Sequence, residues 1–409
     1  MAARVTGMAE RIYLDWNATA PLRPEARAAV LAALDRLGNP SSVHAEGRVA
    51  RAVIEDARRE VAALVGARPA DVTFTSGGTE ANMLALGPDI TRPGQPEPRD
   101  RLLVSAVEHP SVLAGGTFPP EAVERIPVAP SGRVDPPALA RRLGALAAAG
   151  ITRPLVSVML ANNESGIIQP IAEIGETVHA AGGLLHVDAV QALGRMTVDR
   201  DALKADLLSI SAHKIGGPKG AGALIRAADL HVARPVIRGG GQERGLRAGT
   251  ENVAAIAGFG AAAAATRQAL DAEGRHMAAL RDRLEEGLKA ISPAITIFGE
   301  SDLRLPNTTL CAIRGQRAET AVIALDLAGI AVSAGAACSS GKVQPSHVLA
   351  AMGVDAALAG GAIRLSLGYR TTESTILRFL DAWRKLLESL HKRPDDIAAS
   401  SEIAEAGAQ

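Results

Sequence analysis

Short runs of β-forming residues alternate along this chain with longer Ala/Leu/Arg-rich stretches that have helical periodicity. This alternation is typical of a parallel sheet whose strands are connected by helices. Helices are predicted at residues 49–65 and 170–181, and the proline-rich residues 91–99 are predicted to form a surface loop. The predicted strands are residues 71–75, 101–105, 155–160, 183–187 and 206–211. We therefore expect an α/β fold with a large, doubly wound, mostly parallel sheet.

The pattern changes after about residue 265. A long charged helix is predicted at residues 267–290. After it we expect strands at residues 294–298 and 307–313 and helices at 318–328 and 372–391. This succession predicts a smaller α+β domain. The expected organisation is a large domain of residues 16–265, a small domain of residues 1–15 and 266–391, and a frayed tail at 392–409.

Charge and composition narrow the class of partner. Lys and Arg together number 44, as do Asp and Glu, so the net charge is zero and nothing favours nucleic acid or anionic membrane electrostatically. The apolar residues 253–265 fall short of the roughly 18 needed to span a membrane, and the N-terminus lacks the apolar run of a signal peptide. Two cysteines are too few for a disulfide framework. We expect a soluble, cytoplasmic protein that acts on a small molecule or a protein partner.

Three motifs at strand ends suggest a phosphate-bearing aldehyde cofactor. The sequence SAHK at residues 211–214 ends a strand before a glycine-rich run, a suitable place for a Schiff-base lysine, although an ordinary surface lysine has the same local pattern. In HVDAVQ (186–191), Asp188 could pair with a protonated pyridine nitrogen. The loop SGGTE (76–80) offers glycine backbone and a helix N-terminus to a phosphate. The three motifs in this order are far more specific than any one of them.

Further motifs give the chain its resemblance to a known family. They extend from about residue 13 to residue 387 and are YLDWNATAP, GNPSSVH, TSGGTEAN, EHPSV, NNESGIIQP, HVDAVQ, SAHKIGGPKG, GGGQERGLRAGTEN, SAGAACSSG and IRLSLG. The chain resembles the cysteine desulfurases of the NifS/IscS type, which are class-V enzymes of fold-type I that use pyridoxal 5'-phosphate (PLP). The resemblance implies a fold-type I PLP-dependent transferase.

Cofactor contacts follow from this resemblance, position by position. It implies that Lys214 holds PLP covalently, that Asp188 pairs with the pyridine nitrogen and that Gln191 donates to the ring hydroxyl. A buried structural aspartate is the alternative for Asp188. Thr250 resembles a residue that completes the phosphate site of the neighbouring subunit, which implies a homodimer. The implied phosphate contacts within the chain are Gly78, Thr79, Ser211 and His213.

Other matched positions concern the substrate. His109 matches a histidine that stacks on the cofactor ring and moves protons. Asn163, also a cofactor contact, and Arg364 match substrate-binding positions, and an arginine fork suits an α-carboxylate. A helix-capping or surface arginine is the alternative for Arg364. His44 and Asn39 lie in a matching motif without an assignable role.

The two cysteines differ in their surroundings. Cys338 lies in SAGAACSSGKVQPS, whose small and polar residues indicate an exposed, mobile loop, whereas Cys311 lies in the strand-like NTTLCAI and is expected in the core. The resemblance implies that Cys338 receives the sulfur as a persulfide and that it could transiently bind an iron–sulfur cluster. The sequence AACSSGK…PSHVL is most similar to the nitrogen-fixation branch of this family.

The implied activity is PLP-dependent removal of sulfur from L-cysteine, which yields L-alanine and a Cys338 persulfide for an acceptor such as an iron–sulfur scaffold. Nitrogenase maturation, general iron–sulfur assembly and tRNA thiolation all remain open as the destination. A selenocysteine lyase or another class-V aminotransferase is the nearest alternative, although an aminotransferase does not need Cys338. A non-catalytic sulfur carrier would tolerate the loss of Lys214, Asp188 or His109, yet all three are present.

Overall fold

A seven-stranded sheet forms the centre of the large domain. The computed structural model describes residues 11–335 and 346–406, with side chains described as far as residue 389. The strand order is β2 (Val72–Thr75), β9 (Gly222–Arg226), β8 (Leu207–Ser211), β7 (Leu184–Asp188), β6 (Pro154–Ser157), β4 (Arg101–Ser105) and β5 (Val123–Ile126). The five strands from β5 to β8 are parallel, and β9 is antiparallel to both of its neighbours. This mostly parallel sheet confirms the predicted α/β fold.

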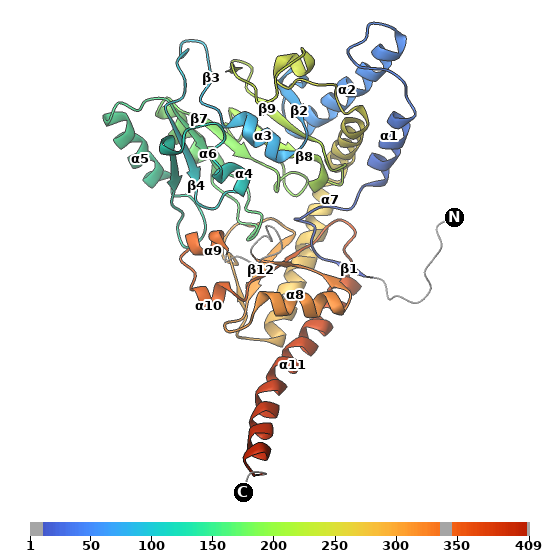
Figure 1. Cartoon of the computed structure of the whole chain (residues 1–409), viewed down its shortest axis with the longest axis vertical. Helices are drawn as coiled ribbons and strands as arrows, with labels where there is room; N and C mark the ends of the chain where they lie inside the picture. Colours follow the sequence, from blue (N-terminus) through green and yellow to red (C-terminus); the bar gives the residue numbers. More distant parts are fainter. Residues whose placement is uncertain (1–10, 336–345, 407–409) are drawn as a thin grey trace.

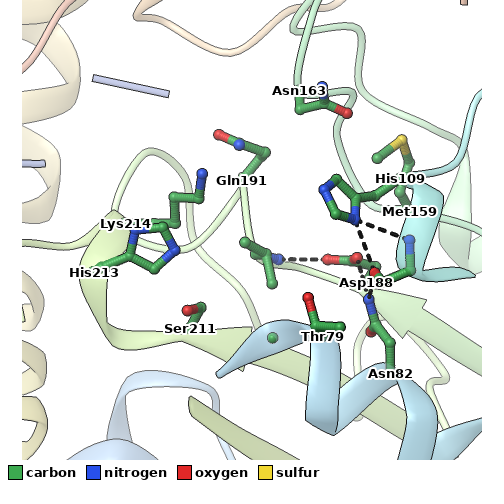
Figure 2. A pocket seen from close by; sticks show the side chains of 13 residues that line it. Thr79, Asn82, His109, Met159, Asn163, Asp188, Gln191, Ser211, His213 and Lys214 are labelled. Carbon is green, nitrogen blue, oxygen red and sulfur yellow. Dashed lines mark hydrogen bonds between the residues drawn. The ribbon is translucent and has the colours of Figure 1, made fainter. Parts of the chain in front are cut away.

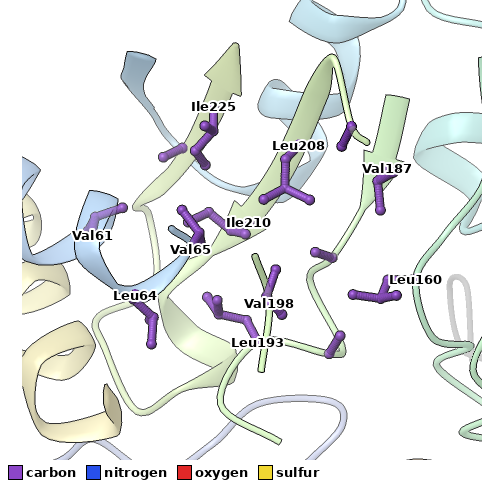
Figure 3. Packing of buried hydrophobic residues seen from close by; sticks show 14 of the residues in the cluster. Val61, Leu64, Val65, Leu160, Val187, Leu193, Val198, Leu208, Ile210 and Ile225 are labelled. Carbon is purple, nitrogen blue, oxygen red and sulfur yellow. The ribbon is translucent and has the colours of Figure 1, made fainter. Parts of the chain in front are cut away.

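Both faces of this sheet are buried. Alternate residues of one strand contribute to different apolar clusters: Leu208 and Ile210 of β8 belong to one cluster and Leu207 to another. Figure 3 shows Leu208 and Ile210 packed with Ile225 of β9 and Val187 of β7. Strands buried on both faces read as continuous apolar runs, which is why these segments could be predicted. The surrounding helices are α1 (Pro24–Leu34), α2 (Ala45–Leu64), α3 (Gly78–Ala85), α4 (Pro110–Leu113), α5 (Pro136–Ala148) and α6 (Ile171–Ala180).

The small domain is built on an antiparallel sheet. Its strand order is β11 (Thr296–Ile297), β12 (Thr308–Ala312), β15 (Ile363–Ser366) and β14 (Ser333–Ala334). The N-terminal strand β1 (Ile12–Tyr13) pairs in parallel with β13 (Ile330–Ala331), and a further short antiparallel pair, β3 (Ile90–Thr91) with β10 (His231–Val232), lies in the large domain. Figure 1 shows α8 (Ala318–Leu327), α9 (His347–Ala351) and α10 (Ala356–Ala359) around the small sheet, below the large domain.

A single long helix connects the two domains. Helix α7 runs from Val253 to Ile291, so the change of pattern predicted near residue 265 falls inside a continuous helix (Figure 1). Its first half packs closely on α1 and α2. The approach is so close that a Cβ added at Gly258 would lie 2.6 Å from Val30 and a Cβ added at Gly260 would lie 2.5 Å from Ala57. Among the described helices, α7 is the one with the length and apolarity to cross a membrane, and those apolar residues lie against α1 and α2 as in a core helix.

The C-terminal helix extends further than the sequence predicts. Helix α11 runs from Glu373 to Ala406, into the segment expected to fray, and its end projects away from the small domain (Figure 1). Residues 395–406 are rich in Ala and Glu and contain no glycine or proline, so their intrinsic propensity favours a helix. Composition without an apolar periodicity led to the expectation of an irregular tail.

Candidate active site

A cavity of about 180 Å³ lies where the parallel strands of the large sheet end. Figure 2 shows the side chains that converge on it from α3, α4 and the ends of β7 and β8. Binding at the carboxyl ends of parallel strands is the general rule for open α/β sheets. Nine of the sequence-predicted residues line it: Gly78, Thr79, His109, Asn163, Asp188, Gln191, Ser211, His213 and Lys214.

Lys214 approaches the cavity from the turn that follows β8. Its ammonium group donates hydrogen bonds to the carbonyl oxygens of Asn17 and Ala18, the latter at 2.9 Å. No carboxylate among the described residues forms an ion pair with it. Burial, together with the charges of Arg195 and Arg364, lowers the pKa of Lys214 to about 7. A neutral, nucleophilic amine is therefore accessible near neutral pH.

A chain of hydrogen bonds joins Asp188 to His109. Buried Asp188 accepts from the amide of Val190 at 3.0 Å and from Nδ2 of Asn82 at 2.8 Å. The same Asn82 nitrogen lies 2.9 Å from the hydroxyl of Ser111, which lies 2.8 Å from Nδ1 of His109. Because Nδ1 also accepts from the Ser111 amide at 3.2 Å, the proton of a neutral His109 belongs on Nε2. Burial lowers the pKa of His109, which favours that neutral form.

One end of the cavity is suited to an anion. The first turn of α3 begins at Gly78, and the leading amide N–H groups of a helix have no intrahelical acceptor. The hydroxyl of Ser211 is buried and lacks a hydrogen-bond partner among the described residues. A Cβ at Gly78 would come within 2.9 Å of Val190, so glycine allows the chain to approach the cavity closely here. Burial lowers the pKa of neighbouring His213 to about 4, so its ring is neutral at neutral pH. Its Nδ1 lies 3.2 Å from the Thr19 hydroxyl.

Two buried carboxyl groups lie behind the cavity. Glu108 is fully buried; its Oε1 accepts from Ser105 and from the amide of Met159, both at 2.6 Å, while Oε2 has no partner among the described residues. Burial raises the pKa of Glu108 to about 8 and that of Glu164 to about 7. The Ser346 hydroxyl donates to Glu164 at 2.5 Å. Glu108 is therefore largely protonated at neutral pH, and Glu164 is about half protonated.

The two residues predicted to bind the substrate are in direct contact. Arg364 donates to the carbonyl oxygen of Asn163 at 2.9 Å and to Oδ1 of Asp15 at 2.7 Å, and its Nε has no partner among the described residues. Arg364 does not itself line the cavity. A substrate carboxylate would therefore compete with Asp15 for the guanidinium. This pairing could not be predicted from the sequence, because it joins the first strand region to β15.

The remaining predicted residues lie elsewhere. Cys338 falls outside the described residues, and Cys311 is fully buried in β12, as expected of a core cysteine. Thr250 is exposed and does not line the cavity of its own chain. His44 caps the N-terminus of α2, and Asn39 accepts from the amide of Ser41 at 2.9 Å, so both have local structural contacts.

The segment before Thr250 is anchored to the anion end of the cavity. Glu243 has φ 46° and is held by a buried ion pair to Arg58, with two contacts of 2.8 Å, and it accepts from the amide of Phe74 in β2. Arg247 bonds Glu80 of α3 at 3.0 Å and the hydroxyl of Ser76 at 2.8 Å. The loop SGGTE and the segment of residues 239–252 are therefore fixed to one another.

Comparison with known proteins identifies the family. The aminotransferase class-V family model matches residues 12–379. A cysteine desulfurase from Cereibacter sphaeroides is 43% identical over 392 residues, which cover 93% of this chain and 97% of that protein. The chain belongs to the cysteine desulfurases of the class-V aminotransferase family.

Solved structures agree with that placement. A NifS-like protein from Rickettsia africae has a TM-score of 0.83 and 36% identity, and the match covers 93% of this chain and 100% of that one. The structure of SspA in complex with cysteine has a TM-score of 0.71 and 28% identity, covering 88% of this chain and 100% of that one. Membership of class V implies PLP as the cofactor of this desulfurase.

Asn82 and Asn17 of the desulfurase site had no predicted role. Asn82 lies four residues after Gly78, one helical turn along α3, so helical spacing could have placed it on the cavity side. Asn17 contributes its backbone carbonyl to Lys214 and to Nε2 of Gln191. A contact made by a backbone carbonyl cannot be predicted from the type of residue that makes it.

Proposed function

We propose that this desulfurase removes sulfur from L-cysteine and releases L-alanine, with PLP held covalently on Lys214. The observation that carries the proposal is the convergence of nine predicted residues on the cavity beside Lys214. The donor set suits the cofactor, because unpartnered Ser211 and the N-terminus of α3 match a phosphate and Asp188 matches a pyridinium. When bound, PLP supplies a conjugated ring that delocalises negative charge developing at the substrate Cα.

Two side chains are suited to move protons. Nζ of Lys214, whose pKa is lowered to about 7, can accept a proton from the substrate and return it within the same cavity. His109 has Nδ1 engaged by Ser111, so Nε2 is the atom that gives up or takes a proton. Hydrogen bonds from Asn82 and Val190 fix the orientation of the Asp188 carboxyl group, which lines the cavity.

The thiolate of Cys338 is proposed as the sulfur acceptor. Its attack on the substrate sulfur forms an S–S bond and breaks the C–S bond, and the electron pair released to carbon is protonated to give alanine. The support is the sequence setting of Cys338 among small, polar residues. We propose that the persulfide is then passed to an iron–sulfur scaffold protein in the cytoplasm. Nitrogenase maturation is the more specific destination proposed, and Cys338 is proposed to bind an iron–sulfur cluster transiently during transfer.

A homodimer is proposed, with Thr250 completing the partner's phosphate site. Support comes from the exposure of Thr250 and from the fixed path of residues 239–252, which Arg51 of α2 also holds through Glu251 at 3.0 Å. Large apolar side chains are exposed in the segments that precede Arg51 and residue 239: Leu34, Leu37, Val43, Val49, Val236 and Ile237. Sedimentation of the purified protein tests this, and a fully active monomer would contradict it.

A cysteine pulse followed by mass spectrometry tests the activity. We expect added sulfur on the Cys338 peptide and alanine in the supernatant. Cys338→Ser should retain the absorbance of bound PLP yet release almost no sulfide, whereas the matched variant Cys311→Ser should stay active. Normal turnover by Cys338→Ser, or sulfur on Cys311, would favour a lyase or aminotransferase instead.

A further inference from the structure

Arg195 is a buried cation without a neutralising partner. The residue follows Gly194 in the turn after β7 and is only 6% exposed. Its guanidinium donates to the carbonyl oxygen of Gln191 at 2.5 Å, to Oε1 of Gln191 at 3.0 Å and to the carbonyl oxygen of Trp16 at 3.4 Å. No described carboxylate pairs with it. Burying a charge without a counter-ion is costly, and Arg195 lines a cavity together with Lys214, which makes it a candidate functional residue.

Of the four other buried arginines among the described residues, Arg23, Arg58 and Arg364 have a carboxylate partner, whereas Arg99, which does not line the active-site cavity, is bonded only to neutral oxygen atoms of Ile90 and Gln95. Arg58 pairs with Glu243, and Arg23, which lines the same small cavity as Arg195, pairs with Glu273 at 2.6 and 3.0 Å. The fold therefore supplies a counter-ion to Arg23 in the same cavity and to Arg364 close to Lys214. At Arg195 it supplies only neutral oxygen atoms.

Lys214 lies between the active-site cavity and a second cavity, and Arg195 lines the second cavity. This second cavity, of about 30 Å³, also includes Thr266 and Tyr369, whose hydroxyl groups are buried without a partner among the described residues. Lys214 is the residue that lines both this cavity and the active-site cavity. The volume suits one or two water molecules, which would solvate the guanidinium without neutralising it.

The charges around Lys214 are few and come from different elements. Arg195 from the turn after β7 and Arg364 from β15 disfavour the ammonium form, while Asp15 and Asp188 favour it. Arg364 is paired with Asp15, so those two charges largely offset each other. His213 and His109 are neutral for the reasons given above. Arg195 is thus the cation beside Lys214 whose field is not cancelled by an ion pair.

We propose that Arg195 is a positioning residue of the active site, whose unneutralised charge keeps the amino group of Lys214 neutral and whose guanidinium orients the side-chain amide of Gln191. The inference rests on the proposed role of Lys214. With Oε1 of Gln191 fixed by Arg195, its Nε2 donates to the Asn17 carbonyl at 3.1 Å, and the second Nε2 hydrogen remains available to the cavity.

The test measures the proton affinity of Lys214 in full-length protein freed of PLP. Acetic anhydride is supplied in trace amounts from pH 5.5 to 10, and acetylation of Lys214 is followed by mass spectrometry against exposed Lys385 as the internal reference. The wild-type midpoint is expected near pH 7. In Arg195→Gln it should rise by about one pH unit, so that labelling at pH 7 falls about fivefold. Arg195→Lys keeps the charge and should keep the wild-type midpoint.

Matched variants separate charge from packing. The double variant Arg23→Gln, Glu273→Gln removes a neutral ion pair beside the same cavity and should leave the midpoint unchanged. Circular dichroism verifies folding, and Arg195→Met is the second neutral variant if Arg195→Gln does not fold. An unchanged midpoint in a folded neutral variant, or an equal rise in Arg195→Lys, would overturn the proposal. Because no cofactor is present, the result does not depend on desulfurase activity; failure of the cysteine pulse experiment would count against the proposed function instead.

Discussion

The active-site cavity and the core of the small domain bury ionisable groups in opposite ways. In the small domain, Glu285 is held by Arg304 at 2.8 and 2.9 Å and by Thr309 at 2.7 Å. Burial raises the pKa of Cys311 to about 12, so the thiol stays neutral between apolar strands. Around the cavity, by contrast, half-buried Lys214 and fully buried Glu108 have no charged partner among the described residues.

This difference indicates what each region is for. Buried polar groups that are fully paired stabilise or specify a core, whereas uncompensated ones cost free energy and cluster at functional sites. The small-domain core therefore reads as structural and the cavity as functional. Removing a group from the cavity should change activity with little loss of stability, and removing one from the small domain should do the reverse.

Lys214→Ala is expected to have the largest effect. Desulfurase activity should fall by about 10³-fold or more, because both covalent attachment of PLP and the proton-accepting amine are lost. The melting temperature of the PLP-free protein should not fall, since a desolvated amine is removed. Lys219→Ala, five residues away at an exposed position, is the control and should keep both activity and bound PLP. Near-normal activity in Lys214→Ala would contradict the assignment of the cavity as the functional region and the small-domain core as the structural one.

The buried carboxyl groups should make stability depend on pH. Glu108 and Glu164 have folded-state pKa values of about 8 and 7, above their ordinary range, so the folded protein binds more protons than the unfolded chain above about pH 5. The contribution of these two groups to the free energy of unfolding should therefore fall as pH rises from 5 to 7, by at most about 1.4 kcal/mol per pH unit for each group. Groups with a lowered pKa act in the opposite direction: His186 and His213, with pKa values of about 3 and 4, do so below about pH 6.5, and Lys214 does so above pH 7.

Urea unfolding of Glu108→Gln measures this contribution. Its amide oxygen can still accept from Ser105 and Met159, so the variant should match wild type near pH 5 and exceed it in stability at pH 7. Glu285→Gln in the small domain is the contrast: it weakens the pair with Arg304 and should lose about 1–3 kcal/mol at neutral pH. A pH profile of Glu108→Gln parallel to that of wild type would show that Glu108 is ionised in the folded protein.

Cys311→Ser should have the smallest effect on activity. Cys311 lies opposite Ile297 and Ile363 in the sheet, where a hydroxyl has no evident partner, so about 1–3 kcal/mol of stability should be lost. Activity per folded molecule should be unchanged. Thermal unfolding and sulfide release measure the two quantities. Reduced turnover at full stability would mean that the small-domain core takes part in the chemistry.

The residues of the cavity could be predicted because each belongs to a motif at a strand end. Lys214, Asp188 and Gly78 follow buried strands, and parallel strands bring their carboxyl ends to one edge of the sheet. The roles of Arg195 and Asn82 could not be predicted in this way, since they depend on contacts between side chains rather than on position. Arg195 is buried and lacks a carboxylate partner, and neither property can be read from sequence spacing.

Two features of the fold could also not be predicted from the sequence. Helix α7 continues through Gly258 and Gly260, which let it pack closely on α1 and α2, although glycine usually weakens a helix. The pairing of Arg364 with Asp15 joins residues 349 positions apart. The role of Cys338 stays a prediction from its motif.

The central claim is that Lys214 carries the cofactor. The most direct measurement is borohydride reduction of the purified, PLP-loaded protein, followed by peptide mass spectrometry. The phosphopyridoxyl group should be found on the peptide that contains Lys214, with Lys204 and Lys219 unmodified. Modification of another lysine, or no adduct at all in protein that still releases alanine from L-cysteine, would contradict the account.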